Sequence, residues 1–152
     1  MPVGVEPPQY DRFPMPRAPV PPEVDEFLRR PNHAVIASLR SDGSPHTVPT
    51  WYDWEDGRAL VNMDESRLRL DFMQKDPRIA LTALDHESWY RHVSLLGLVV
   101  AIEADVGLRD IDRLAVRYTD EPFQTRDRRR FSAWVRVDTW HGWEGGAPWP
   151  RL

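Results

Sequence analysis

The residues best suited to bind a charged ligand form the segment Ser66–Arg69, which reads Ser-Arg-Leu-Arg. A predicted helix begins here, and a helix N terminus presents unpaired N–H groups and the positive end of its dipole. Arginines there add bidentate donors that match phosphate. Because residues two apart do not share a helix face, Arg67 and Arg69 reach one anion only if Arg67 lies at the loop–helix junction. The spacing predicts an anion site, and two exposed arginines paired with Glu65 and Asp71 are an equally supported alternative.

A second candidate lies in the predicted strand that contains Pro49-Thr50-Trp51-Tyr52. Proline within a strand indicates an edge or a bulge and leaves nearby backbone groups unpaired. Such groups beside an aromatic wall can hold a flat heterocycle. A core strand with a local irregularity explains the same pattern at least as well.

A third candidate is the basic segment Gln124–Arg130, with the sequence QTRDRRR. A solvated loop is the favoured interpretation, because runs of like charge are usually exposed. Contact with the anionic tail of a cofactor, or with an anionic substrate, is the alternative.

Side-chain catalysis has little support in this sequence. The nucleophile-elbow, Walker and dinucleotide-binding glycine motifs do not occur. The histidines at 33, 46, 86, 92 and 141 have no metal-ligand spacing, and cysteine is absent, so no metal site is predicted. The catalytic residues stay unassigned, and Tyr52, Trp51 or an ordered water is a candidate proton donor.

Predicted strands and short helices must position these residues. Hydrophobic patterning and turn signals predict six strands, at 33–40, 45–54, 58–63, 78–84, 90–104 and 131–138. Capping and proline signals predict helices at 23–30, 67–75 and 110–119. The first three strands are expected to form an antiparallel meander, and Gly97 is expected to mark a bulge or a close approach.

This order of elements predicts a mainly β (α+β) fold, a six-stranded antiparallel barrel with short flanking helices. A barrel of this size has an interior filled by side chains, so a ligand must bind in a groove on the outside of the barrel. We expect a second copy of the chain to cover that groove. Residues 1–22 hold more than half of the 15 prolines and are expected to form an arm outside the domain at 23–152.

Composition narrows the classes of partner. A net charge of -4 and a pI near 5.7 argue against a dedicated nucleic-acid-binding protein. The apolar stretch Val93–Ala101 is about half the ~20 residues that a membrane-spanning helix needs. The first residues lack the pattern of a secretory signal, and a chain without cysteine is compatible with the cytoplasm, which is the expected location.

The chain resembles the flavin- and deazaflavin-dependent oxidoreductases of the split β-barrel superfamily, related to pyridoxamine 5′-phosphate oxidase. The likeness covers about residues 23–143 and rests on the order and spacing of several loose motifs. They are HAVIASLRSDGSPHTVPTWYDWEDGRALVNM, SRLRLDFMQKDPRIALTAL, VSLLGLVVAIEA and RDIDRLAVRYTDEPF. The Pro-x-Trp-Tyr strand and the Ile-Asp-x-Leu-Ala helix are most similar to the branch that uses the deazaflavin coenzyme F-420. Phe72 departs from the family, which often has Asn there.

The resemblance implies a homodimer with the cofactor in two grooves at the subunit interface. It assigns the cofactor phosphate to Arg67 and Arg69, beside Ser66. It places two strands along the tricyclic ring, and it lets the partner subunit close the groove with the C-terminal segment. The residues so implied are Val48, Pro49, Thr50, Trp51, Val61, Asn62, Met63, Trp140 and His141.

The expected function is hydride transfer between a flavin-like cofactor and an unsaturated small molecule, with F-420 favoured over FMN. The cofactor carries such chemistry, which explains the missing catalytic motif. One alternative is a non-catalytic protein of the same fold that binds flavin, haem or a tetrapyrrole. Another is an FMN-dependent pyridoxamine 5′-phosphate oxidase, which needs a second phosphate site.

Overall fold

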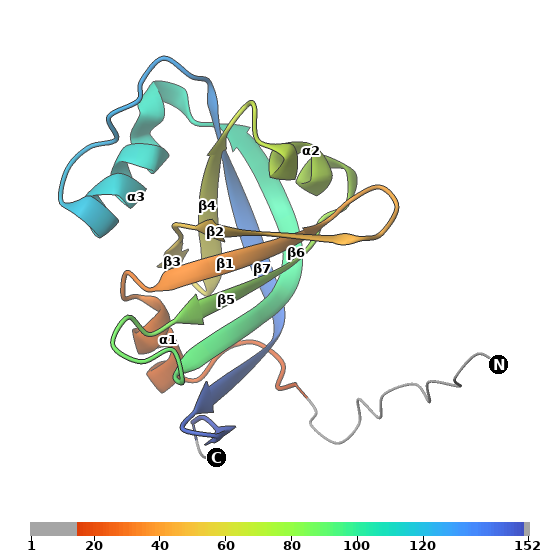
Figure 1. The fold of residues 1–152 in the computed structure, drawn as a ribbon, viewed down its shortest axis with the longest axis vertical. Coiled ribbons are helices and arrows are strands. Elements are labelled where there is room, and N and C mark those ends of the chain that lie inside the picture. Colours follow the sequence, from red (N-terminus) through yellow and green to blue (C-terminus); the bar gives the residue numbers. More distant parts are fainter. Residues whose placement is uncertain (1–14, 151–152) are drawn as a thin grey trace.

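A single antiparallel sheet curls into a barrel in the computed structural model, which describes residues 15–150 (Figure 1). The strand order is β2-β1-β5-β6-β7-β4-β3, and β8 pairs with β7. The strands are β1 (His33–Leu39), β2 (Pro45–Thr50), β3 (Asp53–Glu55), β4 (Arg58–Asp64), β5 (Arg78–Leu84), β6 (His92–Ala104), β7 (Arg130–Glu144) and β8 (Ala147–Pro148). The helices are α1 (Pro22–Leu28), α2 (Leu68–Lys75) and α3 (Arg109–Thr119). A 3₁₀ turn at Val106–Leu108 directly precedes α3. The predicted mainly β class is confirmed.

The predicted meander is wrong, because the chain crosses the barrel after its second strand. The segment predicted as one strand breaks at Trp51 and Tyr52, β2 pairs with β1, and β3 pairs with β4 at the opposite end of the strand order. Tyr52 fixes this crossing: its side chain is fully buried, and its hydroxyl donates to the carbonyl oxygen of Leu28 at 2.8 Å. An open seam therefore separates β2 from β4.

The two longest strands, β6 and β7, form the spine of the sheet. The prediction for Gly97 is confirmed, because the register shifts between Leu96 and Gly97, and a Cβ on Gly97 would lie 1.9 Å from the carbonyl oxygen of Arg136. Strand β7 continues to Glu144, beyond the predicted end, so Trp140 lies in a strand and not in an irregular tail.

Alternating side chains from the strands fill the barrel, and α1 closes its lower end (Figure 1). The buried faces of β1 and β5 follow the two-residue period of a strand. Residues 15–20 of the predicted arm run along β7, where the N–H of Ala18 donates to the carbonyl oxygen of Asp138 at 2.9 Å. The remainder of the arm lies outside the described residues. None of the helices at 15–150 has the length and apolar character to cross a membrane.

Candidate cofactor site

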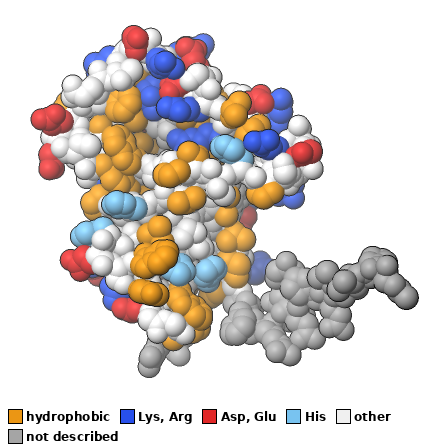
Figure 2. Space-filling model, in the orientation of Figure 1, with side chains coloured by type: hydrophobic (Ala, Val, Ile, Leu, Met, Phe, Trp, Pro, Cys, Tyr) orange, Lys and Arg blue, Asp and Glu red, His pale blue; other side chains and the backbone are white. Residues whose placement is uncertain are grey.

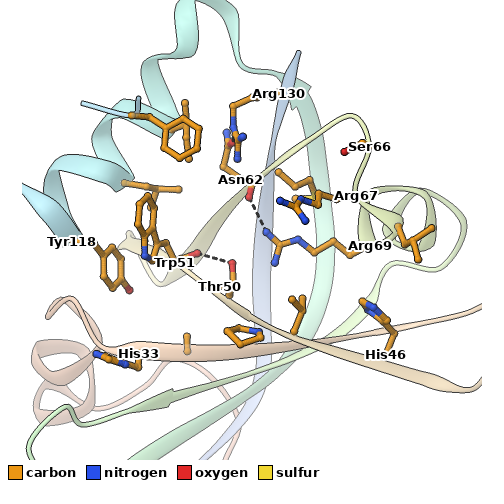
Figure 3. A pocket seen from close by; sticks show the side chains of 18 residues that line it. His33, His46, Thr50, Trp51, Asn62, Ser66, Arg67, Arg69, Tyr118 and Arg130 are labelled. Carbon is orange, nitrogen blue, oxygen red and sulfur yellow. Dashed lines mark hydrogen bonds between the residues drawn. The ribbon is translucent and has the colours of Figure 1, made fainter. Parts of the chain in front are cut away.

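A cavity of about 660 Å³ occupies the open seam between β2 and β4, and α2 and α3 flank it (Figure 3). Lys and Arg side chains gather in the upper half of this face, between α3 and α2 (Figure 2). Nine of the predicted site residues line the cavity: Val48, Pro49, Thr50, Trp51, Asn62, Met63, Ser66, Arg67 and Arg69. The crossing between β2 and β3 produces this arrangement, because it separates strands that a meander would pair.

Arg69 is a largely buried cation, and no acidic side chain among residues 15–150 forms an ion pair with it. Its Nη2 donates to the backbone oxygen of Asn62 at 2.8 Å, whereas its buried Nε and Nη1 have no partner among the described residues. Burial, together with the charges of Arg67 and Arg130, lowers the pKa of Arg69 to about 10, so it is still charged at neutral pH. A buried charge without a partner is costly, so the side chain suits an anionic ligand.

Arg67 lies at the loop–helix junction, as convergence on one anion requires. It is the N-cap residue of α2 and has extended backbone angles. Its side chain is 68% exposed, and its Nε lies 3.3 Å from Oδ2 of Asp64. The alternative pairing with Glu65 and Asp71 does not form, since Asp71 instead pairs with Lys75. Figure 3 shows Arg67 and Arg69 pointing into the same cavity.

Asp64 shapes the loop that carries these arginines. Its carboxylate accepts hydrogen bonds from the backbone N–H and the hydroxyl of Ser66. Burial opposes ionisation of Asp64, but the hydrogen bonds from Ser66 and the charges of Arg67 and Arg128 lower its pKa. The Asp64 carboxylate is therefore occupied by hydrogen bonds within the loop, and the cavity keeps an excess of positive charge.

Arg130, the last residue of the basic segment Gln124–Arg130, enters the same cavity from β7, although a solvated loop was the favoured interpretation of that segment. Its Nε donates to Oδ1 of Asn62 at 2.8 Å. The basic segment thus divides, because Arg126 forms an ion pair with Asp112 and Arg129 is exposed. Arg130 is the first residue of β7, whereas Arg126 and Arg129 lie in the loop before it, so separating them from the sequence alone needs the exact start of β7.

An aromatic wall forms the end of the cavity opposite Arg69 (Figure 3). The ring of Trp51 stacks on Tyr118 with centroids 5.5 Å apart and an interplanar angle of 8°, and Phe123 meets it edge-on at 6.2 Å. The hydroxyl of Tyr118 donates to the carbonyl oxygen of Asn32 at 2.6 Å. Burial raises the pKa of Tyr118. A flat, rigid surface for a planar ligand is the result.

Four residues named from the sequence do not reach this cavity. Val61 and Trp140 point into the hydrophobic core, and Val61 does so because strand neighbours face opposite sides. His141 is half-buried on β7 opposite Ser94. Tyr52 is buried at the crossing away from the cavity, which excludes it as a proton donor there. Closure of the groove by a partner's C-terminal segment stays a prediction.

Two kinds of acidic arrangement are missing from the part of the chain that the structure describes. No Asp or Glu lines the cavity between residues 15 and 150. The same residues contain no group of three or more His, Asp or Glu side chains that could hold a metal ion. The cavity therefore favours an anionic ligand with a flat portion.

Comparisons with known proteins agree with this geometry. Residues 20–144 match the pyridoxamine 5′-phosphate oxidase family. Among solved structures, an F-420 reductase is 26% identical with a TM-score of 0.71, and the match covers 80% of this chain and 98% of that one. A conserved hypothetical protein from Mycobacterium tuberculosis is 19% identical, with a TM-score of 0.63 and coverage of 84% and 86%. General Stress Protein 26 from Bacillus anthracis is 16% identical, with a TM-score of 0.59 and coverage of 80% and 94%. No curated protein matches the chain.

Proposed function

Since the chain belongs to the pyridoxamine 5′-phosphate oxidase family, we propose that it is an oxidoreductase that holds a flavin-type cofactor in the seam cavity. The observation that carries this proposal is the largely buried guanidinium of Arg69, which among the described residues has unpaired N–H groups and forms no ion pair with an acidic side chain. Flavin-type cofactors carry a phosphate, and such a guanidinium is suited to it.

The lining residues fit the two parts of such a cofactor. Arg67, Arg69 and Ser66 hold the phosphate, while Val48 and Met63 lie along the ring. The bound cofactor supplies hydride transfer to or from an unsaturated small molecule. The protein contributes position, since the stacked wall at Trp51 limits where a planar substrate can lie.

We favour coenzyme F-420 over FMN as the cofactor. The support is the F-420 reductase, whose structure this chain covers almost completely at 26% identity. The Pro-x-Trp-Tyr segment that suggested this branch forms the crossing and the aromatic wall. Pure FMN specificity would overturn this preference while leaving the phosphate site intact.

We also propose that two copies of the chain pair. Strand β6 is central in the sheet, yet its outward-facing residues Leu96, Leu98 and Val100 are all apolar. Leu96 and Val100 are 37% and 48% exposed. Apolar patches on an outer face mark contact surfaces, and a symmetric pair would bury this patch on both copies.

Titration of the purified protein with FMN and with F-420 tests the proposal. Fluorescence of the cofactor gives each affinity, and we expect F-420 to bind at least about tenfold more tightly, equivalent to 1.4 kcal/mol. Binding of neither cofactor would refute the proposed function. A reduced cofactor that stays bound but passes hydride to none of a panel of unsaturated acceptors would instead support a binding protein.

A further inference from the structure

We propose that Arg130 is a third residue that binds the anionic group of the cofactor, and that Asn62 is the positioning residue that aims it. This inference rests on the proposed function, because it assumes that a phosphate-bearing ligand occupies the cavity. Arg67 and Arg69 belong to the loop and helix after β4, whereas Arg130 comes from β7. A ligand held by all three would be gripped from two sides.

Arg130 has the geometry of a ligand-binding side chain. Its side chain is only 10% exposed, and it lines the cavity. Nε is engaged by Asn62, but within residues 15–150 the terminal nitrogens donate no hydrogen bond. The nearest carboxylate oxygen, Oδ2 of Asp64, lies 3.9 Å from Nη1, which makes a long ion pair but is too far for a hydrogen bond. The ring of Phe123, 4.6 Å from the guanidinium carbon, supports the side chain from another direction.

The hydrogen bonds of the Asn62 side-chain amide fix the direction in which it faces Arg130. Its Nδ2 donates to Oδ2 of Asp105 and to Oγ of Ser132, both at 3.1 Å, and its Oδ1 accepts from Arg130. A flipped amide would direct its NH₂ group at the Arg130 N–H and its oxygen at the Asp105 carboxylate. Both contacts would be repulsive, so the amide has one stable orientation.

The partners of Asn62 are themselves fixed. The Asp105 carboxylate accepts from the backbone N–H groups of Asp110 and Ile111, each at 2.9 Å, at the start of α3. The Ser132 hydroxyl donates to Oδ2 of Asp110 at 2.6 Å. The backbone oxygen of Asn62 also accepts a hydrogen bond from Nη2 of Arg69. Asn62 therefore connects two of the three arginines to a network that does not depend on the ligand.

The charges around the cavity agree with this assignment. Burial lowers the pKa of Arg130, and the charge of Arg67 acts in the same direction, whereas the carboxylates of Asp64 and Asp105 oppose this shift. Three guanidinium groups thus face a cavity whose nearby carboxylate, Asp64, already accepts two hydrogen bonds from Ser66. An anionic ligand offsets this repulsion better than a neutral one.

The test compares FMN with riboflavin, which has the same ring and no phosphate. If the first titration selects F-420, the corresponding pair is F-420 and its phosphate-free deazaflavin. The variants are Arg130→Gln and Arg129→Gln, which remove the same charge at adjacent positions, one inside the cavity and one exposed. We expect Arg130→Gln to lower the affinity for the phosphorylated ligand by about tenfold or more. The affinity for the phosphate-free ligand should fall by less than about twofold. Equal losses for the two ligands, or equal effects of the two variants, would overturn the proposal.

Asn62→Ala tests the positioning role in a double-mutant cycle with Arg130→Gln. We expect Asn62→Ala to lower the affinity for the phosphorylated ligand only. The double variant should bind that ligand about as tightly as Arg130→Gln alone does. If the role of Asn62 is purely structural, Asn62→Ala should lower the affinity for both ligands, and this loss should add to the loss caused by Arg130→Gln. If Asn62→Ala does not fold, the comparison of Arg130→Gln with Arg129→Gln still decides the role of Arg130.

Inorganic phosphate separates failure of this inference from failure of the proposed function. If no flavin-type cofactor binds, the proposed function fails, and a phosphate-dependent rise in the Tm of the full chain becomes the readout. A rise that persists in Arg129→Gln and disappears in Arg130→Gln would support the anion-binding role. A rise that Arg130→Gln retains in full would overturn it.

Discussion

A single side chain, Arg69, carries a cost in stability that the proposed anionic ligand would offset. Its buried Nε and Nη1 have no partner among the described residues, and burial with two neighbouring arginines lowers its pKa to about 10, well below the usual value for arginine. The folded chain therefore holds this proton less tightly than the unfolded chain does. The charged side chain opposes folding at neutral pH, and this cost is relieved only as the pH rises above about 10.

Arg69→Met should consequently stabilise the ligand-free protein while weakening cofactor binding. We expect the free energy of unfolding at pH 7 to rise by about 0.5–2 kcal/mol, because an uncompensated charge is replaced by an apolar side chain of similar length. Urea titration measures this change. The advantage over the wild type should shrink above pH 10, and a variant less stable than the wild type at pH 7 would contradict the cost assigned to Arg69.

Removing both arginines of the loop tests the phosphate assignment directly. Arg67→Ala combined with Arg69→Ala should weaken cofactor binding by about 2–4 kcal/mol, since each charged hydrogen bond contributes ~1.5–3 kcal/mol and the two are not additive. Lys75→Ala, which removes a charge from the exposed end of the same helix, is the control and should bind as the wild type does. Fluorescence titration gives all affinities, and an unchanged affinity in a folded double variant would remove both arginines from the site.

Residue types predicted the candidate anion-binding loop but not every residue that lines the cavity. Ser-Arg-Leu-Arg at a helix start is a local signal, so Arg67 and Arg69 were found from the sequence. The inclusion of Arg130 and the exclusion of Val61 depend on which side of a strand each faces. A one-residue change in a strand boundary reverses that assignment, and the boundary is set by long-range pairing with β4 and β6.

At the scale of elements, local patterns located the strands and helices but not their pairing. Turn signals placed β1 beside β2 and β3 beside β4 correctly, but the segment 45–54 is not one continuous strand, so the predicted meander does not form. The crossing at Trp51–Tyr52 follows from burial of Tyr52 against the end of α1, a contact between segments more than 20 residues apart. Strand β7 was underestimated for the same reason, because its final residues are held by pairing with the start of β6.

The β6–β7 spine should be sensitive to one added methyl group. Gly97→Ala would place a Cβ 1.9 Å from a backbone oxygen of β7, which cannot move as a flexible side chain can. We expect a loss of about 3 kcal/mol in the free energy of unfolding, measured by urea titration. Glu103→Gln, an exposed change on the same strand, should stay within about 0.5 kcal/mol. An equally small effect at Gly97 would show that the bulge tolerates a side chain.

At the scale of the whole molecule, the open seam is the reason why we propose a second copy of the chain. The barrel interior is filled, so the chain's large cavity lies where the sheet fails to close. A groove of this kind is open to water on one side, and a hydride transferred there benefits from exclusion of water. A symmetric partner is the simplest cover, because any contact that closes one groove closes the other.

Paired acidic substitutions in the apolar patch of β6 test this assembly. Wild-type protein should have a solution mass twice that of the 17.7 kDa chain, and Leu96→Glu with Val100→Glu should give a folded monomer, because four carboxylates would meet in a symmetric contact. Val106→Glu, at an 85% exposed apolar residue outside the patch, is the matched control and should remain paired. Light scattering gives the masses, and the monomeric variant should bind cofactor at least about tenfold more weakly if the groove needs both copies. A wild-type monomer that binds cofactor tightly would refute the paired assembly and leave the arginine site standing on its own.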